Sequence, residues 1–125
     1  MKRELLDDLP RFEPGWVWLV GAGPGDPGLL TLHGVNALRQ ADVIVYDALV
    51  NPKLLAMANP EAETIYAGKR GGKPSPKQAD ISRTLIEKAQ AGLRVMRLKG
   101  GDPYMFGRGG EEARTLAEAG VKFRI

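Results

Sequence analysis

The sequence predicts an α/β domain: a parallel sheet of about five strands with helices on both faces. Short apolar runs alternate with segments of helical periodicity along almost the whole chain. Such alternation implies parallel strands joined by right-handed crossovers. The runs are apolar at consecutive positions, which is typical of strands buried on both faces. A chain of 125 residues is also long enough to bury one core.

Strands are expected where several apolar or β-branched residues follow one another. The run W-V-W-L-V at 16–20 is the clearest example. In chain order, the expected strands are 16–20, 43–46, 64–66, 95–98 and 121–125.

Helices are expected between these strands, at 29–41, at 52–58, from Ser75 to just before Gly92, and at 111–119. The third of these has the clearest boundaries. Ser75 suits an N-cap, Pro76 the first helical position and Gln78 the far end of a capping box. Gly92 suits the left-handed residue that often ends a helix. A glycine-rich loop is expected at 100–110.

Composition excludes several classes of site. The chain has no cysteine and one histidine, which excludes disulfides, thiolate metal sites and histidine-rich metal sites. No apolar run approaches a membrane span, and no apolar stretch after the first charges suggests a secretory signal. A cytoplasmic protein with no membrane partner is therefore expected.

Basic residues are concentrated in one segment, although the net charge is only +3. Residues 66–79 contain no acid, and more basic residues follow on a later strand and loop. The basic residues in question are Lys69, Arg70, Lys73, Lys77, Arg94, Arg97, Lys99 and Arg108. This pattern fits an acidic small molecule, a nucleic acid or a solvated loop. Few aromatic residues stand among these cations, which disfavours base stacking with a nucleic acid.

Unusual residues follow four of the expected strands. Because parallel strands end at the same edge of a sheet, and open α/β folds bind ligands at that edge, a composite site is expected there. The residues concerned are 21–26 (G-A-G-P-G-D), Asp47, Lys69, Arg70, 100–103 (G-G-D-P) and 106–110 (F-G-R-G-G).

The first of these loops is not a dinucleotide fingerprint. The pattern G-x-G-x-x-G needs glycine where the chain has Asp26. Pro24 stiffens the loop, and prolines remove backbone donors that a pyrophosphate would use. The loop therefore favours a ligand without a pyrophosphate, or else it is a tight strand-to-helix turn.

The candidate side chains also have alternative roles. Asp47 suits either a general base or a helix cap. Lys69 and Arg70 suit carboxylate binding or a solvated pair, and Lys69 also suits proton transfer. Asp102 is typical of a turn, and Met105 suits either a pocket wall or the core.

Four motifs together resemble the S-adenosylmethionine-dependent tetrapyrrole methyltransferases, and in particular the branch that methylates uroporphyrinogen III. They are V-G-A-G-P-G-D-P-G-L-L-T at 20–31, Y-D-A-L-V at 46–50, G-K-R at 68–70 and L-K-G-G-D-P-Y-M-F-G-R-G-G-E-E at 98–112. The resemblance runs from about Trp16 to Ile125. The first motif is shared widely in the family, whereas the other three are more specific to this branch.

The resemblance implies methylation of carbons 2 and 7 of uroporphyrinogen III to precorrin-2, on the way to sirohaem and cobalamin. It implies S-adenosylmethionine as donor, S-adenosylhomocysteine as co-product and no metal. Asp47 resembles the proton acceptor and Lys69 the proton donor. The substrate's eight carboxylates would suit Arg70 and Arg108. The residues carried over as donor contacts are Pro24, Gly100, Gly101, Asp102 and Met105.

The family has two domains, and this resemblance implies that 16–125 is the N-terminal one. Residues 1–15 are then a flexible lead-in. A second domain is expected to be absent from this chain, so that the chain alone is inactive, and the complete protein is expected to be a homodimer. Three alternatives remain: a methyltransferase for another precorrin intermediate, a nucleotide-binding α/β module such as a dehydrogenase, and a nucleic-acid-binding module.

Overall fold

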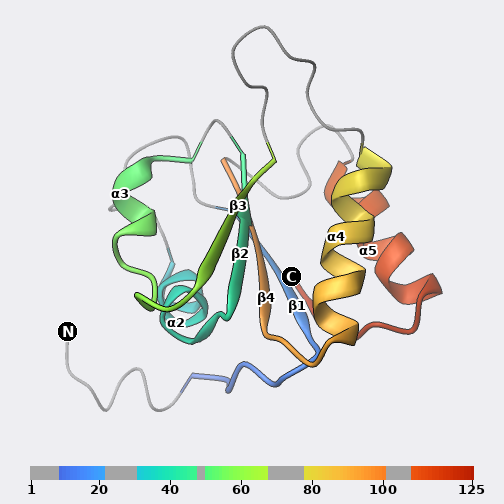
Figure 1. The fold of residues 1–125 in the computed structure, drawn as a ribbon, viewed down its shortest axis with the longest axis horizontal. Coiled ribbons are helices and arrows are strands. Elements are labelled where there is room, and N and C mark those ends of the chain that lie inside the picture. Colours follow the sequence, from blue (N-terminus) through green and yellow to red (C-terminus); the bar gives the residue numbers. More distant parts are fainter. Residues whose placement is uncertain (1–8, 22–30, 48–49, 68–77, 101–107) are drawn as a thin grey trace, which may run out of the picture.

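The computed structural model describes residues 9–21, 31–47, 50–67, 78–100 and 108–125. Five parallel strands form one sheet in the order β3-β2-β4-β1-β5. Helices α2 and α3 cover one face, and α4 and α5 cover the other (Figure 1). The predicted fold class is confirmed. In chain order the elements are β1 (Val17–Gly21), α2 (Leu32–Gln40), β2 (Val43–Tyr46), α3 (Pro52–Leu55), β3 (Glu63–Tyr66), α4 (Gln78–Gln90), β4 (Val95–Lys99), α5 (Arg108–Glu118) and β5 (Phe123–Arg124).

The sheet separates two apolar cores. Successive strand residues point to opposite faces, so Trp18, Ile44 and Met96 pack with α2 and α3. Val17, Val43, Val95 and their neighbours pack with α4 and α5 instead. This explains why the strands are apolar at consecutive positions.

Helix α2 begins later than the predicted residue 29. Thr31 has extended backbone angles and its Oγ1 accepts a hydrogen bond from the Gly34 N–H at 3.1 Å. Thr31 is therefore the N-cap, and the first helical residue is Leu32. The prediction missed this cap because the leucines before Thr31 continue the apolar pattern.

Helix α5 begins earlier than predicted, at Arg108 instead of residue 111. The prediction placed 106–110 in a loop because Gly109 and Gly110 are poor helix formers. Packing further along the helix, where Leu116 is fully buried, offsets their low propensity. Gly120, just past the end of α5, has the positive φ of 74° expected there.

The described part of the N-terminal segment packs on the domain. Phe12 is fully buried and stacks on Trp18 with ring centroids 4.5 Å apart. The Asn36 side chain donates to the Pro10 carbonyl at 2.7 Å. The flexible lead-in predicted for 1–15 is therefore wrong for residues 9–15, because an aromatic side chain there completes the core. Residues 1–8 lie outside the described part.

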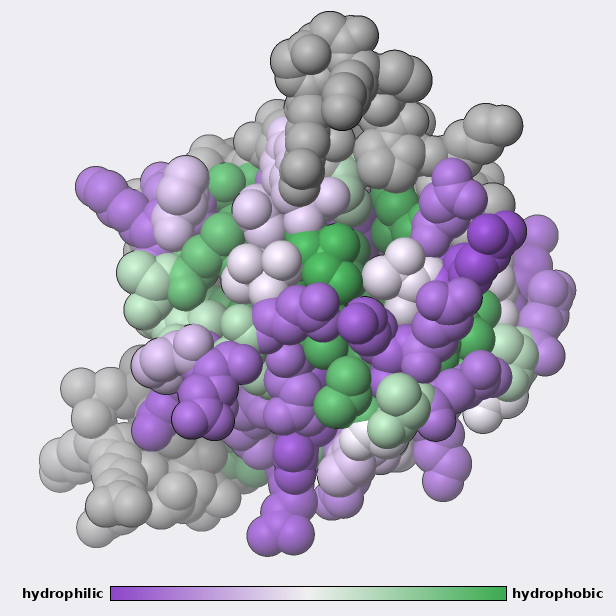
Figure 2. All heavy atoms as spheres, viewed as in Figure 1, coloured by the Kyte–Doolittle hydropathy of each residue, from purple (hydrophilic) through white to green (hydrophobic). Residues whose placement is uncertain are grey.

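The face shown in Figure 2 carries hydrophobic side chains in small patches between larger hydrophilic areas. This is the usual surface of a domain whose apolar side chains are mostly inside. Among the described residues, the large hydrophobic side chains that are exposed are those of Met57 and Ile125.

Candidate functional site

The strand ends define one edge of the sheet. Parallel pairing aligns Tyr46 with both Tyr66 and Leu98, and it aligns Gly21 with Lys99. The ends of β1, β2, β3 and β4 therefore lie at the same edge, which we call the carboxyl edge. This is where the sequence places the composite site.

Asp47 and Gly100 meet at the carboxyl edge. Asp47 directly follows β2, and Gly100 directly follows the neighbouring strand β4. The Gly100 N–H donates to the Asp47 carboxylate, with the nitrogen 3.3 Å from Oδ1 and 3.4 Å from Oδ2. The structure thus brings together two predicted site residues that are 53 positions apart in the sequence.

The local backbone helps to hold Asp47 at this edge. Its carbonyl accepts a hydrogen bond from the Val50 N–H at 3.2 Å, and its side chain is only partly buried. The Gly100 N–H gives the Asp47 carboxylate a backbone hydrogen-bond donor. A carboxylate held in this way can attract a cation, accept a proton, or fix the backbone at Gly100.

Most of the other predicted site residues lie outside the described part of the chain. They are Pro24, Lys69, Arg70, Gly101, Asp102 and Met105. The backbone of Arg108 is described and opens α5. The predicted roles of all seven residues stay predictions.

The basic residues on and beside β4 do not form the surface patch that the sequence suggested. Arg97 and Lys99 are only 3% and 7% exposed. Arg97 Nε donates to Glu112 Oε1 of α5 at 3.2 Å, so this cation pairs inside the molecule. The reason is strand alternation, which turns Arg97 toward the face covered by α4 and α5.

Arg94 lies at the opposite edge of the sheet, before β4 begins. Its guanidinium is 3.4 Å from Asp42 Oδ2, and its backbone N–H donates to the same oxygen at 2.8 Å. The sequence grouped Arg94 with the other basic residues of this part of the chain, and the structure places it apart from the carboxyl edge.

Sequence reasoning missed the buried pair of Arg97 and Glu112. The signal was present, because an arginine within the apolar run V-M-R-L must find a partner if the strand is buried on both faces. The partner could not be identified, because the sequence does not show which face of α5 packs on the sheet.

Two hollows that are lined by described residues were not predicted from the sequence. The smaller one, of about 80 Å³, lies between β2, β3 and α4, close to the carboxyl edge. It has room for a few water molecules and not for a cofactor. Tyr66 is in its wall and packs against Tyr46, with ring centroids 5.4 Å apart.

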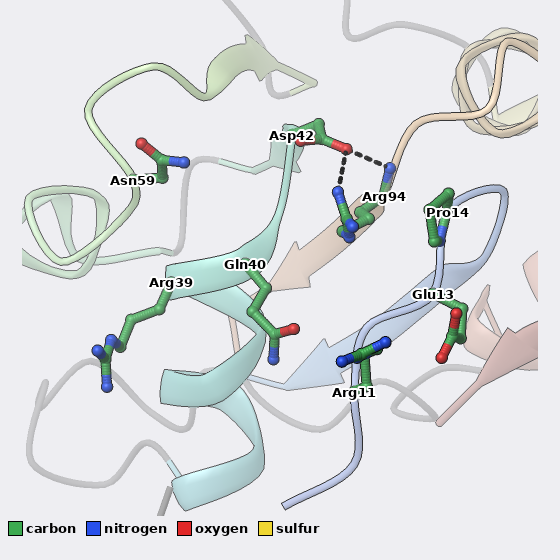
Figure 3. Close-up of a pocket in the computed structure, with 8 residues that line it drawn as sticks. All are labelled: Arg11, Glu13, Pro14, Arg39, Gln40, Asp42, Asn59 and Arg94. Atoms are coloured by element: carbon green, nitrogen blue, oxygen red, sulfur yellow. Dashed lines mark hydrogen bonds and ion pairs between the residues drawn. The ribbon is translucent and has the colours of Figure 1, made fainter. Parts of the chain in front are cut away.

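The larger hollow, of about 550 Å³, lies at the starts of β2 and β4 (Figure 3). Asp42 and Arg94 form an ion pair in its wall, and the Arg39 side chain points away from them. Its other lining residues are Arg11, Glu13, Pro14, Gln40 and Asn59. It is therefore separate from the edge that carries Asp47 and Gly100.

Within the described ranges, no group of three or more histidine or acidic side chains is arranged to hold a metal ion. No helix of those ranges is long and apolar enough to cross a membrane.

Comparison with known proteins shows which proteins this chain is similar to. The family model for Tetrapyrrole (Corrin/Porphyrin) Methylases matches residues 16–125. A uroporphyrinogen-III C-methyltransferase of Sinorhizobium sp is 70% identical over 122 residues, covering 98% of this chain and 44% of that protein. Siroheme synthase 1 of Aeromonas hydrophila is 54% identical over 122 residues, covering 98% of this chain and 26% of that protein.

A solved structure is also similar. The uroporphyrin-III C-methyl transferase of Thermus thermophilus, complexed with S-adenyl homocysteine, superposes with a TM-score of 0.75 at 50% identity. The match covers 87% of this chain and 46% of that one. This chain thus spans less than half the length of each of these three proteins.

Proposed function

The chain belongs to the tetrapyrrole methylase family, and from this premise we propose that it is part of an S-adenosylmethionine-dependent methyltransferase. Its substrate is uroporphyrinogen III, which is methylated at carbons 2 and 7 to give precorrin-2. The contact between Asp47 and Gly100 carries this proposal, because it joins two of the motifs that are specific to this branch of the family.

When bound, the donor would supply a methyl group carried on a sulfonium sulfur. A pyrrole carbon would take the methyl group, and the sulfur would leave as the neutral sulfide of S-adenosylhomocysteine. This chemistry needs alignment of the reacting atoms and no metal. The described chemistry of the carboxyl edge fits it, since the Asp47 carboxylate suits a neighbouring positive charge. The residues that would hold the donor are Pro24, Gly100, Gly101, Asp102 and Met105.

Asp47 is the proposed proton acceptor. Methylation leaves positive charge on the macrocycle, and loss of a proton removes it. The hydrogen bond from Gly100 gives the carboxylate a fixed place at the edge, as general base catalysis requires. Lys69 is the proposed proton donor.

Substrate carboxylates are the proposed partners of Arg70 and Arg108. Guanidinium groups bind carboxylates through two parallel hydrogen bonds, and the substrate carries eight carboxylates. The position of Arg108 in the first turn of α5 supports this role, because the helix begins there after the glycine-rich segment that follows β4. The complete protein is proposed to be a cytoplasmic homodimer that acts without nucleic-acid or membrane partners.

Calorimetry with S-adenosylhomocysteine tests the cofactor class. Titration into the full-length protein should show saturable binding, and titration with NADH should show none. Binding of NADH without S-adenosylhomocysteine would overturn the proposal in favour of a nucleotide-binding module. Lys53→Ala serves as a control variant because Lys53 is exposed on α3. It should bind S-adenosylhomocysteine as the unmodified protein does.

A further inference from the structure

The Arg97–Glu112 pair is buried where β4 and α5 pack together. The Arg97 side chain is 4% exposed and that of Glu112 is fully buried, with 3.2 Å between Nε and Oε1. Arg97 also lies close to the neighbouring strand, with Nη1 3.5 Å from the Val45 carbonyl oxygen. One arginine thus connects β2, β4 and α5.

Stability alone is a poor explanation for this pair. Removing two charges from water costs about as much free energy as their attraction returns, and apolar replacements of similar volume often stabilise a protein. What an ion pair adds over an apolar contact is direction, because its hydrogen bond fixes both distance and angle.

The Arg97–Glu112 pair lies between the end of β4 and the first part of α5, so its fixed distance and angle act on how these two elements are placed. Arg97 lies three residues before Gly100, which the Asp47 carboxylate holds. Glu112 lies four residues after Arg108, where α5 begins. Leu116, one turn beyond Glu112, anchors the C-terminal half of α5 by apolar packing. Glu112 is the fifth of the eleven residues of α5 and anchors the half that begins at Arg108.

We propose that Arg97 and Glu112 are positioning residues that fix the first turns of α5 relative to the end of β4. They thereby set the separation between Gly100 and Arg108. Three of the proposed donor contacts, Gly101, Asp102 and Met105, stand between those two residues in the sequence. This inference rests on the proposed function for its link to the donor, but the anchoring of α5 does not.

The test is the double variant Arg97→Met/Glu112→Leu in the full-length protein. It removes both charges of the pair and puts apolar side chains of similar size in their place, so the melting temperature should stay within a few degrees of the unmodified protein. We expect the Kd for S-adenosylhomocysteine to rise about tenfold or more, since small misplacements of binding groups have large effects. Hydrogen exchange at the amides of 112–114 should become at least about tenfold faster, because local opening of the first turns of α5 would be easier, whereas exchange at Leu19 in β1 should not change.

The control is Glu63→Gln/Lys88→Met, which removes a partly exposed ion pair with 3.0 Å between Lys88 Nζ and Glu63 Oε1. It should change neither the Kd nor exchange at 112–114. If the first double variant does not fold, Arg97→Lys is measured in the same way. Lysine keeps the charge but lacks the planar fork, and it should give the same changes at smaller size.

Unchanged exchange at 112–114 would overturn the proposal, and so would faster exchange throughout the core, which would show a role in stability alone. Unchanged S-adenosylhomocysteine binding beside faster exchange at 112–114 would overturn its link to the donor. If the unmodified protein binds no S-adenosylhomocysteine, the proposed function fails, and the exchange measurement by itself then decides whether the pair anchors α5.

Discussion

Asp47 has two roles, and substitutions at this position can separate them because asparagine and alanine should affect the two roles differently. Its carboxylate accepts the Gly100 N–H, which is a positioning contact, and it is also the proposed proton acceptor. An asparagine keeps an oxygen that can accept the N–H but lacks the basicity of a carboxylate. Alanine lacks both.

We therefore predict that Asp47→Asn lowers kcat by about 10²-fold or more, as expected when a general base is lost, while S-adenosylhomocysteine binding changes little. Asp47→Ala should lower kcat similarly and also weaken S-adenosylhomocysteine binding. Steady-state kinetics and calorimetry on both variants provide the measurement. Normal kcat in Asp47→Asn would show that Asp47 only positions Gly100.

Phe12, unlike Asp47, is a residue whose importance the sequence did not indicate. It is fully buried and stacked on Trp18, although it precedes the first strand. Replacing a buried phenylalanine by alanine costs about 3–5 kcal/mol through lost burial and a cavity. Phe12→Ala should lower the free energy of unfolding by about that much in urea denaturation.

Met57→Ala is the matched control for Phe12→Ala, because Met57 is 44% exposed. A surface substitution of this kind should change the free energy of unfolding by less than about 0.5 kcal/mol. Equal effects of the two variants would contradict the assignment of Phe12 to the core.

At the scale of elements, strands were easier to predict than helix ends. The run 43–46 coincides with β2 because four consecutive apolar residues leave little choice of boundaries. The start of α2 was misplaced because the cap at Thr31 is one hydrogen bond and not a pattern. The start of α5 was misplaced because local propensity at Gly109 and Gly110 is outweighed by packing elsewhere in the helix.

The N-cap assignment gives a prediction for α2. Thr31→Ala removes the acceptor for the Gly34 N–H and should destabilise the protein by about 1 kcal/mol, whereas Thr31→Ser keeps the hydroxyl and should cost less. Thermal unfolding of the two variants measures the difference. If alanine and serine give the same melting temperature, Thr31 Oγ1 does not cap the helix.

For the whole molecule, the location of the site was more predictable than the hydrogen bonds and ion pairs that its residues make. Parallel strands had to end at one edge, so Asp47 and Gly100 were expected to be near each other. The sequence did not show that the carboxylate accepts the Gly100 N–H, because that depends on the order in which β2 and β4 lie in the sheet. Nor did it separate Arg94, Arg97 and Lys99, whose neighbours are set by strand direction and helix packing.

The most direct test of the central claim is methyl transfer to uroporphyrinogen III by the full-length protein. The protein would be incubated with S-adenosylmethionine and uroporphyrinogen III under reducing conditions, and the product analysed by mass spectrometry. The account predicts two added methyl groups per molecule of uroporphyrinogen III, with one S-adenosylhomocysteine formed for each methyl group. Methylation of a later precorrin without methylation of uroporphyrinogen III would contradict it.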